Sequence, residues 1–189
     1  METYTSYQNA KSVVDCWVFS LYLMYGFEQG KIPDDIFKNK LKFKSNGEAV
    51  ISLKPKKPKI DIDGLSHNLM SYILGTCFLT FDEALDDIFG DKPEEYKDDD
   101  IDSLRAIVYM IRCAHAHTPS KPKWRIDKQK YKRLFIIQEI DFKIDFRDLN
   151  GKELSENHHN GFYGLWGLMD YTLALLKKYS SSNGATKNE

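Results

Sequence analysis

The sequence predicts a mainly α protein with a four-helix bundle-like core and peripheral β-hairpins. Four long stretches carry apolar residues at helical spacing, whereas the strand-like segments are short and too few for an independent sheet. Such apolar helices bury their faces against one another. With 189 residues, 42% of them hydrophobic, the chain has the size of one domain. We therefore predict a single helical domain over residues 1–179, with hairpin insertions near 41–53 and 133–155 and a disordered polar tail over 180–189.

The first half of the chain predicts two helices separated by a hairpin. Apolar periodicity places the first helix at about residues 7–29, where Gly30 suits the C-terminal cap and Pro33 opposes an early restart. Asn46-Gly47 is a strong signal for a hairpin turn. The basic segment from Lys54 to Lys59 predicts a proline-stiffened connector.

The next two helices are predicted at about residues 64–89 and 101–117. Aspartates at 98–100 precede the second of these, where they favour capping and complement the helix dipole. The apolar stripe expected on the helix at 64–89 contains Leu65, Leu69, Ile73, Cys77 and Phe81.

The last third of the chain predicts two strands and a final helix. Segments 133–138 and 142–146 have strand character, Asn150-Gly151 marks a tight turn, and apolar periodicity resumes over about residues 160–179.

Charge and cysteine content narrow the class of protein. The net charge of −1 predicts no strong overall attraction to nucleic acid or membrane, so a polyanion would need a local patch. Cys16, Cys77 and Cys113 form no CxxC pair and indicate neither a zinc site nor a disulfide framework. The start of the chain lacks a signal-peptide pattern, and the apolar run at 13–27 is too short to cross a bilayer. We expect a cytoplasmic protein with no cofactor, metal or membrane contact.

The candidate functional residues lie at the end of the third predicted helix. Its last residues are Arg112-Cys113-Ala114-His115-Ala116-His117, and Pro119 follows. A fixed cation beside a group that exchanges protons near neutral pH suits phosphodiester chemistry or phosphate binding. On an ideal helix Arg105 and Arg112 share one line, His115 falls within the core stripe, and His117 lies about 140° from Arg112. The alternative is structural: His115 is a hydrogen-bonded core histidine, and the arginines pair with carboxylates.

The segment from Arg112 to His117 resembles the R-x4-H motif of the HEPN superfamily, and its continuation to Trp124 is similar to small uncharacterised bacterial proteins with the same pattern. Members of that superfamily are helical bundles that commonly dimerise with their motif helices at the dimer cleft. Many are metal-independent endoribonucleases of toxin–antitoxin or antiviral systems. The resemblance therefore implies a homodimer, RNA as ligand, an antitoxin-like protein as a further partner, and Arg112 and His117 as catalytic residues.

In the implied reaction, His117 transfers a proton at the ribose 2′-hydroxyl or the leaving oxygen, and Arg112 stabilises charge on the phosphate. Cys113 stands where the superfamily usually has a polar residue, and a thiol is a poor hydrogen-bond donor. That departure favours the alternative function, a non-catalytic helical module for dimerisation or protein interaction.

Further candidate contacts with anions or RNA come from both sides of the motif. Arg105 and His115 lie in the helix itself. The basic segment that follows it could track an RNA backbone and stack bases, or could be a solvated loop. Its candidate residues are Lys121, Lys123, Trp124 and Arg125. His158-His159 shows no metal-ligand spacing with the motif histidines, so no metal site is predicted.

Overall fold

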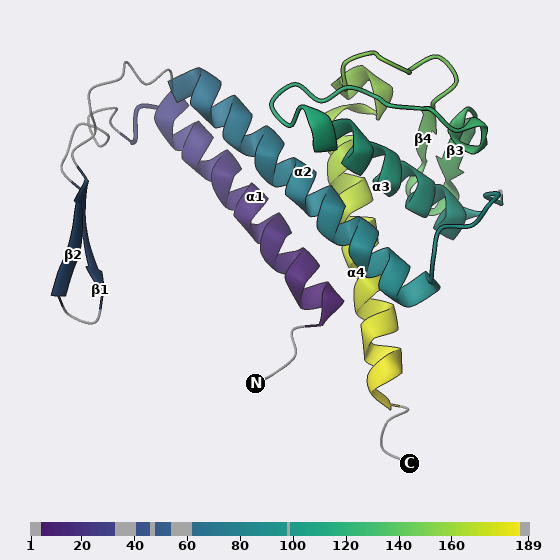
Figure 1. Ribbon diagram of the computed structural model, residues 1–189, viewed down its shortest axis with the longest axis horizontal. Coiled ribbons are helices and arrows are strands. Elements are labelled where there is room, and N and C mark those ends of the chain that lie inside the picture. The colour runs from purple at the N-terminus through teal and green to yellow at the C-terminus, as the bar shows by residue number, and fades with distance from the viewer. Residues whose placement is uncertain (1–4, 33–40, 46–47, 54–61, 98, 186–189) are drawn as a thin grey trace.

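The computed structural model describes residues 5–32, 41–45, 48–53, 62–97 and 99–185 (Figure 1). It confirms the predicted class, a mainly α protein with four long helices and small antiparallel strand pairs. The helices are α1 (Ser6–Glu28), α2 (Ile62–Phe89), α3 (Asp100–His117) and α4 (Gly161–Ala185). The strands are β1 (Leu41–Ser45), β2 (Glu48–Leu53), β3 (Leu134–Ile137) and β4 (Phe142–Asp145).

Helix α2 is the centre of the helical core, since it packs against α1, α3 and α4 (Figure 1). It runs antiparallel to α1, and the Ser6 hydroxyl at the start of α1 donates to Asp87 near the end of α2 at 2.9 Å. Fully buried aromatic and aliphatic side chains fill the space between the helices, among them Trp17, Phe78, Phe81, Ile107 and Ile111. Burial of these apolar faces is what holds the helices together.

The predicted stripe of α2 is correct only in its second half. Cys77 and Phe81 are fully buried, but Leu65 and Leu69 are 49% and 41% exposed. The end of α3 reaches α2 at Gly75, so the first turns of α2 lie beyond the part that α3 covers. Periodicity located the apolar face of α2 correctly. The first turns of that face remain partly exposed because α3 does not reach them.

The start of α3 shows the predicted acidic cap. The Asp99 carboxylate accepts a hydrogen bond from the Asp102 backbone at 2.8 Å, and Asp100 and Asp102 lie in the first turn, where they complement the helix dipole. Asp100 also accepts hydrogen bonds from the backbone of Gln138 and Glu139. It thereby attaches the turn between β3 and β4 to the start of α3.

Strands β3 and β4 lie at the edge of the helical core but contribute to it. They pair antiparallel, with Leu134 opposite Asp145 and Ile137 opposite Phe142. One face of the pair is buried, as the alternation of the strands requires; its side chains are Phe135, Ile137, Phe142 and Ile144.

Other predicted boundaries shift or fall outside the described residues. Helix α4 continues to Ala185, six residues past its predicted end and into the segment predicted as a disordered tail. Strands β1 and β2 form the predicted antiparallel pair. Three predicted features lie outside the described residues: the turn at Asn46-Gly47, the role of Pro33 in preventing an early helix restart, and the connector from Lys54 to Lys59. Within the described ranges, no helix is long and apolar enough to span a bilayer.

Candidate functional site

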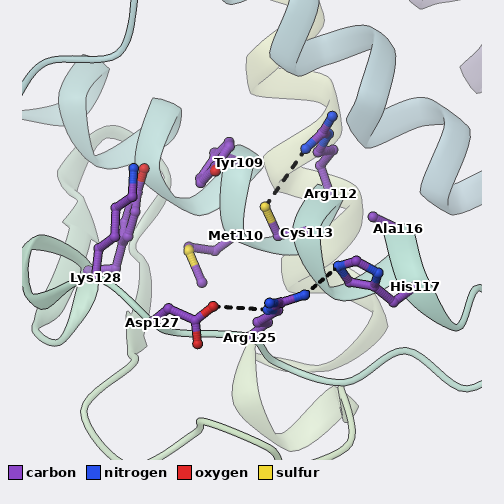
Figure 2. Close-up of a pocket in the computed structure, with 10 residues that line it drawn as sticks. Tyr109, Met110, Arg112, Cys113, Ala116, His117, Arg125, Asp127 and Lys128 are labelled. Carbon is purple, nitrogen blue, oxygen red and sulfur yellow. Dashed lines mark hydrogen bonds and ion pairs between the residues drawn. The ribbon is translucent and has the colours of Figure 1, made fainter.

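The last turns of α3 and the chain that follows them enclose a pocket of about 270 Å³ (Figure 2). The pocket combines cationic and titratable side chains at its rim with aromatic and sulfur-containing side chains in its wall. Its lining residues are Tyr109, Met110, Arg112, Cys113, Ala116, His117, Arg125, Asp127, Lys128 and Tyr131.

The pocket exists because the chain reverses direction after α3. Pro119 disfavours helical geometry at Thr118, whose backbone has left the helix (φ −140°, ψ 73°). The Thr118 hydroxyl donates to the Lys121 carbonyl at 3.1 Å, which closes a turn. The Lys123 backbone then donates to the Ala114 carbonyl at 3.3 Å and returns the chain to the end of α3.

Trp124 anchors the returning segment. Its backbone N–H donates to the Lys152 carbonyl, and its own carbonyl accepts from Gly151, which lies at positive φ in the predicted turn after Asn150. The Trp124 side chain is 1% exposed, donates from its indole Nε1 to His158 Nδ1 at 3.0 Å and packs edge-on against Phe146. The prediction that Trp124 stacks on RNA bases is therefore wrong, because both its indole faces and its N–H are committed inside the protein.

The return brings Arg125 to His117. Arg125 Nη1 lies 2.8 Å from His117 Nε2, and Arg125 Nε donates to an Asp127 carboxylate oxygen at 2.9 Å (Figure 2). A guanidinium can only donate, so in this contact His117 Nε2 is the acceptor, which assigns the ring proton to Nδ1. The three side chains form one hydrogen-bonded chain at the pocket rim.

Arg112 lies on the other side of the pocket, with its guanidinium pointing away from His117 (Figure 2). Its contacts are long: Nη1 is 3.9 Å from the Cys113 sulfur, and Nε is 4.0 Å from a carboxylate oxygen of Asp82. The side chain is 37% exposed. Burial raises the pKa of Asp82 above its usual range, although Lys92 and Arg112 act to lower it. Among the residues that the structure describes, the Arg112 guanidinium thus has no close partner that would fix its position near the pocket.

Two tyrosines form the inner wall of the pocket. The rings of Tyr109 and Tyr131 stack at 5.4 Å with an interplanar angle of 24°, and the Lys92 ammonium lies 4.8 Å from the centre of the Tyr109 ring. Burial, followed by a hydrogen bond with Cys113, raises the pKa of Tyr109 to about 12. Its hydroxyl therefore stays protonated at neutral pH and can donate to a ligand.

Arg105 does not reach this pocket, which corrects its prediction as an anion contact. The residue is 6% exposed, and its Nη2 donates to the carbonyls of Gly90 and Asp91, at 2.5 and 2.9 Å. The same atom lies 3.4 Å from Asp86. These partners belong to the end of α2 and the loop after it, so Arg105 joins α3 to that loop and is not available to an external anion.

His115 is a core residue, as the structural alternative expects. It is 4% exposed, its Nδ1 lies 3.0 Å from the Ile111 carbonyl, and burial lowers its pKa. At its back is Gly75 of α2, where an added Cβ would come within 2.9 Å of the His115 Cβ. The imidazole thus supports close packing of α2 against α3.

A second groove lies between α2 and the end of α3, with a volume of about 380 Å³. Arg112 and Ala116 line both this groove and the first pocket. The remaining lining is mostly apolar and consists of Tyr72, Gly75, Thr76, Leu79, His115 and Pro119.

The basic segment after α3 contributes unequally to the pocket. Arg125 and Lys128 line it, whereas Lys121 pairs with Glu153 at 3.0 Å and the Lys123 backbone forms a β-bridge with that glutamate. The sequence-based set of site residues omitted Asp127. Its spacing two residues after Arg125 could have suggested an ion pair, but no local pattern shows that this pair meets His117.

Cysteine and histidine side chains elsewhere have separate roles. Cys16, Cys77 and Cys113 are free thiols, and burial raises the pKa of Cys77 to about 12. His158 accepts from Trp124, and His159 is buried with Nδ1 3.1 Å from the Gly161 carbonyl. In the described part of the chain, no three His, Cys, Asp or Glu side chains are grouped so as to hold a metal ion.

Comparisons of the sequence with protein-family models, of the chain with curated proteins, and of its fold with solved structures find no match. What the pocket can do is therefore inferred from its residues and their geometry.

Proposed function

We propose that this chain is a HEPN-like RNA-binding protein that cleaves RNA as a metal-independent endoribonuclease in a defence or toxin-type system. The observation that carries the proposal is the shared pocket of Arg112, His117 and Arg125, with Lys128 at its rim. Three cations within one small pocket attract a phosphate, and a neutral imidazole beside them can exchange a proton.

The proposed cleavage chemistry gives each of these residues a role. Arg112 and Arg125 hold the non-bridging oxygens of a phosphodiester and stabilise the charge that grows on them as the 2′-oxygen attacks phosphorus. His117 takes the 2′-hydroxyl proton. The bond to the 5′-oxygen breaks as the cyclic phosphate forms, and the imidazolium returns its proton to that leaving oxygen. No step of this scheme requires a metal ion.

A homodimer is the proposed assembly, with the end of α3 at the interface. Support comes from the direction of Arg112, which faces away from its own His117 and lines the neighbouring groove. Tyr72 and Leu79 beside that groove are 50% and 38% exposed, so a second copy would cover apolar surface there. Such a contact would place the arginines of two copies near one another, where a polyanion can bind both.

The apolar groove also supports the second candidate, a non-catalytic module for dimerisation or for binding an antitoxin-like protein. Cys113 favours it, because the thiol meets Tyr109 and Arg112 and is a weak donor toward a phosphate. The two candidates differ in whether the pocket performs chemistry.

The deciding experiment is incubation of unstructured RNA with the protein in excess chelator. The proposal expects fragments from the parent protein and loss of cleavage in His117→Ala and Arg112→Ala, with Cys113→Asn equal to the parent or faster. Arg147→Ala is the matched control, because Arg147 is an exposed arginine paired with Asp145 on β4. If the parent neither cuts nor binds RNA at low salt, the nuclease proposal fails and the interaction module is favoured.

A further inference from the structure

The chain of Asp127, Arg125 and His117 has a consequence for how the pocket would work. The ring nitrogen that faces the pocket, Nε2 of His117, already accepts a hydrogen bond from Arg125 at 2.8 Å. A lone pair that accepts this N–H cannot at the same time take a proton from a ribose hydroxyl. His117 therefore cannot act as a base through Nε2 until Arg125 moves.

We propose that Arg125, besides holding the substrate phosphate, gates His117, and that a phosphate group opens the gate by taking over the guanidinium. This inference rests on the proposed function. A guanidinium binds a phosphate through two parallel charge-assisted hydrogen bonds, which are stronger than one bond to a neutral imidazole. Binding of the substrate phosphate to Arg125 thus frees Nε2 next to the ribose that must lose its proton.

Asp127 sets the position of the gate. It accepts from Arg125 Nε at 2.9 Å, which leaves Nη1 directed at His117 (Figure 2). The remaining charged or polar residues that line the pocket are Tyr109, Arg112 and Cys113 from α3, and Lys128 and Tyr131 from the returning segment. Asp127 supplies the negative charge among these lining residues, so it competes with an incoming phosphate for Arg125.

The arrangement is open to test because it contributes little to the fold. The side chains of Arg125 and Asp127 are 58% and 64% exposed, and exposed ion pairs stabilise proteins weakly. Substitutions here change the contact with His117 and leave the core intact. The pair of Asp145 and Arg147 has the same residue types and spacing, Arg147 is 63% exposed, and Arg147 is not part of the pocket lining, which makes it a matched control.

The first test is ¹H–¹⁵N NMR of the His117 ring, with inorganic phosphate as the probe. The parent protein is expected to show the proton on Nδ1 and a hydrogen-bonded Nε2 whose signal shifts as phosphate is added. Arg125→Ala should show the shifted Nε2 signal from the start and respond little to phosphate, and Asp127→Asn should lie between them. Arg147→Ala should match the parent. An Nε2 signal that is the same in Arg125→Ala and the parent, or that does not move with phosphate in the parent, overturns the gate.

The second test uses cleavage kinetics and separates the gate from the proposed function. Arg125→Ala should raise KM on the order of tenfold, the effect of one lost charged contact, with a smaller fall in kcat because His117 is released. Arg125→Lys should recover part of the loss in KM. A fall in kcat with unchanged KM overturns the gate while leaving the nuclease proposal standing. Absence of cleavage by the parent ends the nuclease proposal, and the NMR response to phosphate still decides whether Arg125 controls Nε2.

Discussion

Arg105 and Arg112 are seven residues apart on one line of α3, and the structure gives them opposite environments. Arg105 is 6% exposed and donates to the carbonyls of Gly90 and Asp91, because the loop after α2 folds over it. The Arg112 side chain is 37% exposed, and its contacts with Cys113 and Asp82 are 3.9 and 4.0 Å long. The same residue type on the same helix face thus joins two elements at one end and lines a pocket at the other.

The two arginines of α3 are expected to differ most in how much each contributes to the stability of the fold. Arg105→Ala removes the donor to the carbonyls of Gly90 and Asp91 and one of the two cationic partners of Asp86, and should lower the free energy of unfolding by about 3 kcal/mol. Arg105→Lys should recover only part of this loss, because the lysine ammonium ends short of the position of Nη2, the atom that donates to both carbonyls. Urea denaturation measures both. A loss below about 0.5 kcal/mol in Arg105→Ala would show that this network is not structural, since that is the range of ordinary surface substitutions.

The next largest effect on stability is expected where α2 packs against α3 at Gly75 and His115. Gly75→Ala places a Cβ within 2.9 Å of the His115 Cβ, so α2 and α3 must separate, at a cost of about 1–3 kcal/mol. Gly167→Ala in α4 is the control, because nothing lies within 4 Å of its added Cβ. That change should stabilise by about 0.5–1 kcal/mol through helix propensity. Thermal unfolding of both variants decides: equal effects would mean that α2 and α3 are not closely packed at Gly75.

A smaller effect on stability depends on pH and comes from Asp82, the residue of α2 that lies 4.0 Å from Arg112. Burial raises the pKa of Asp82, so the folded protein binds this proton more tightly than the unfolded chain does. Ionisation of Asp82 therefore opposes folding. The stability of the parent relative to Asp82→Asn should decline as pH rises above 3.8 through the raised pKa, and then level off. Denaturation across this pH range tests it. A rise would mean that pairing with Lys92 outweighs burial.

The smallest expected change in stability belongs to Arg112. Its side chain is partly exposed and its contacts are long, so Arg112→Ala should cost less than about 1 kcal/mol. A loss as large as that of Arg105→Ala would remove the contrast between the two arginines.

Size-exclusion chromatography with light scattering on the same samples tests the proposed homodimer; a monomer at high micromolar concentration would contradict it.

Periodicity predicted the four helices, and the helix wheel placed His115 in the core, because both depend on the spacing of residues along one helix. Other features depend on neighbours distant in sequence. The burial of Arg105 comes from a loop fourteen or so residues earlier, and that of Trp124 from residues near 150 and 158. The meeting of Arg125 with His117 depends on the turn after Pro119, whose direction no local pattern specifies. The residue types at the helix end could therefore be read from the sequence, but not which neighbouring side chains join them.

The central claim is that the open end of α3, and not the buried one, contacts a phosphate backbone. Its most direct test is the affinity for a short unstructured RNA, measured by fluorescence anisotropy at several salt concentrations with Arg112→Ala and the control Arg147→Ala. The account predicts roughly tenfold weaker binding and a shallower salt dependence for Arg112→Ala, and parent-like binding for Arg147→Ala. Equal affinity and equal salt dependence in the parent and Arg112→Ala would contradict it.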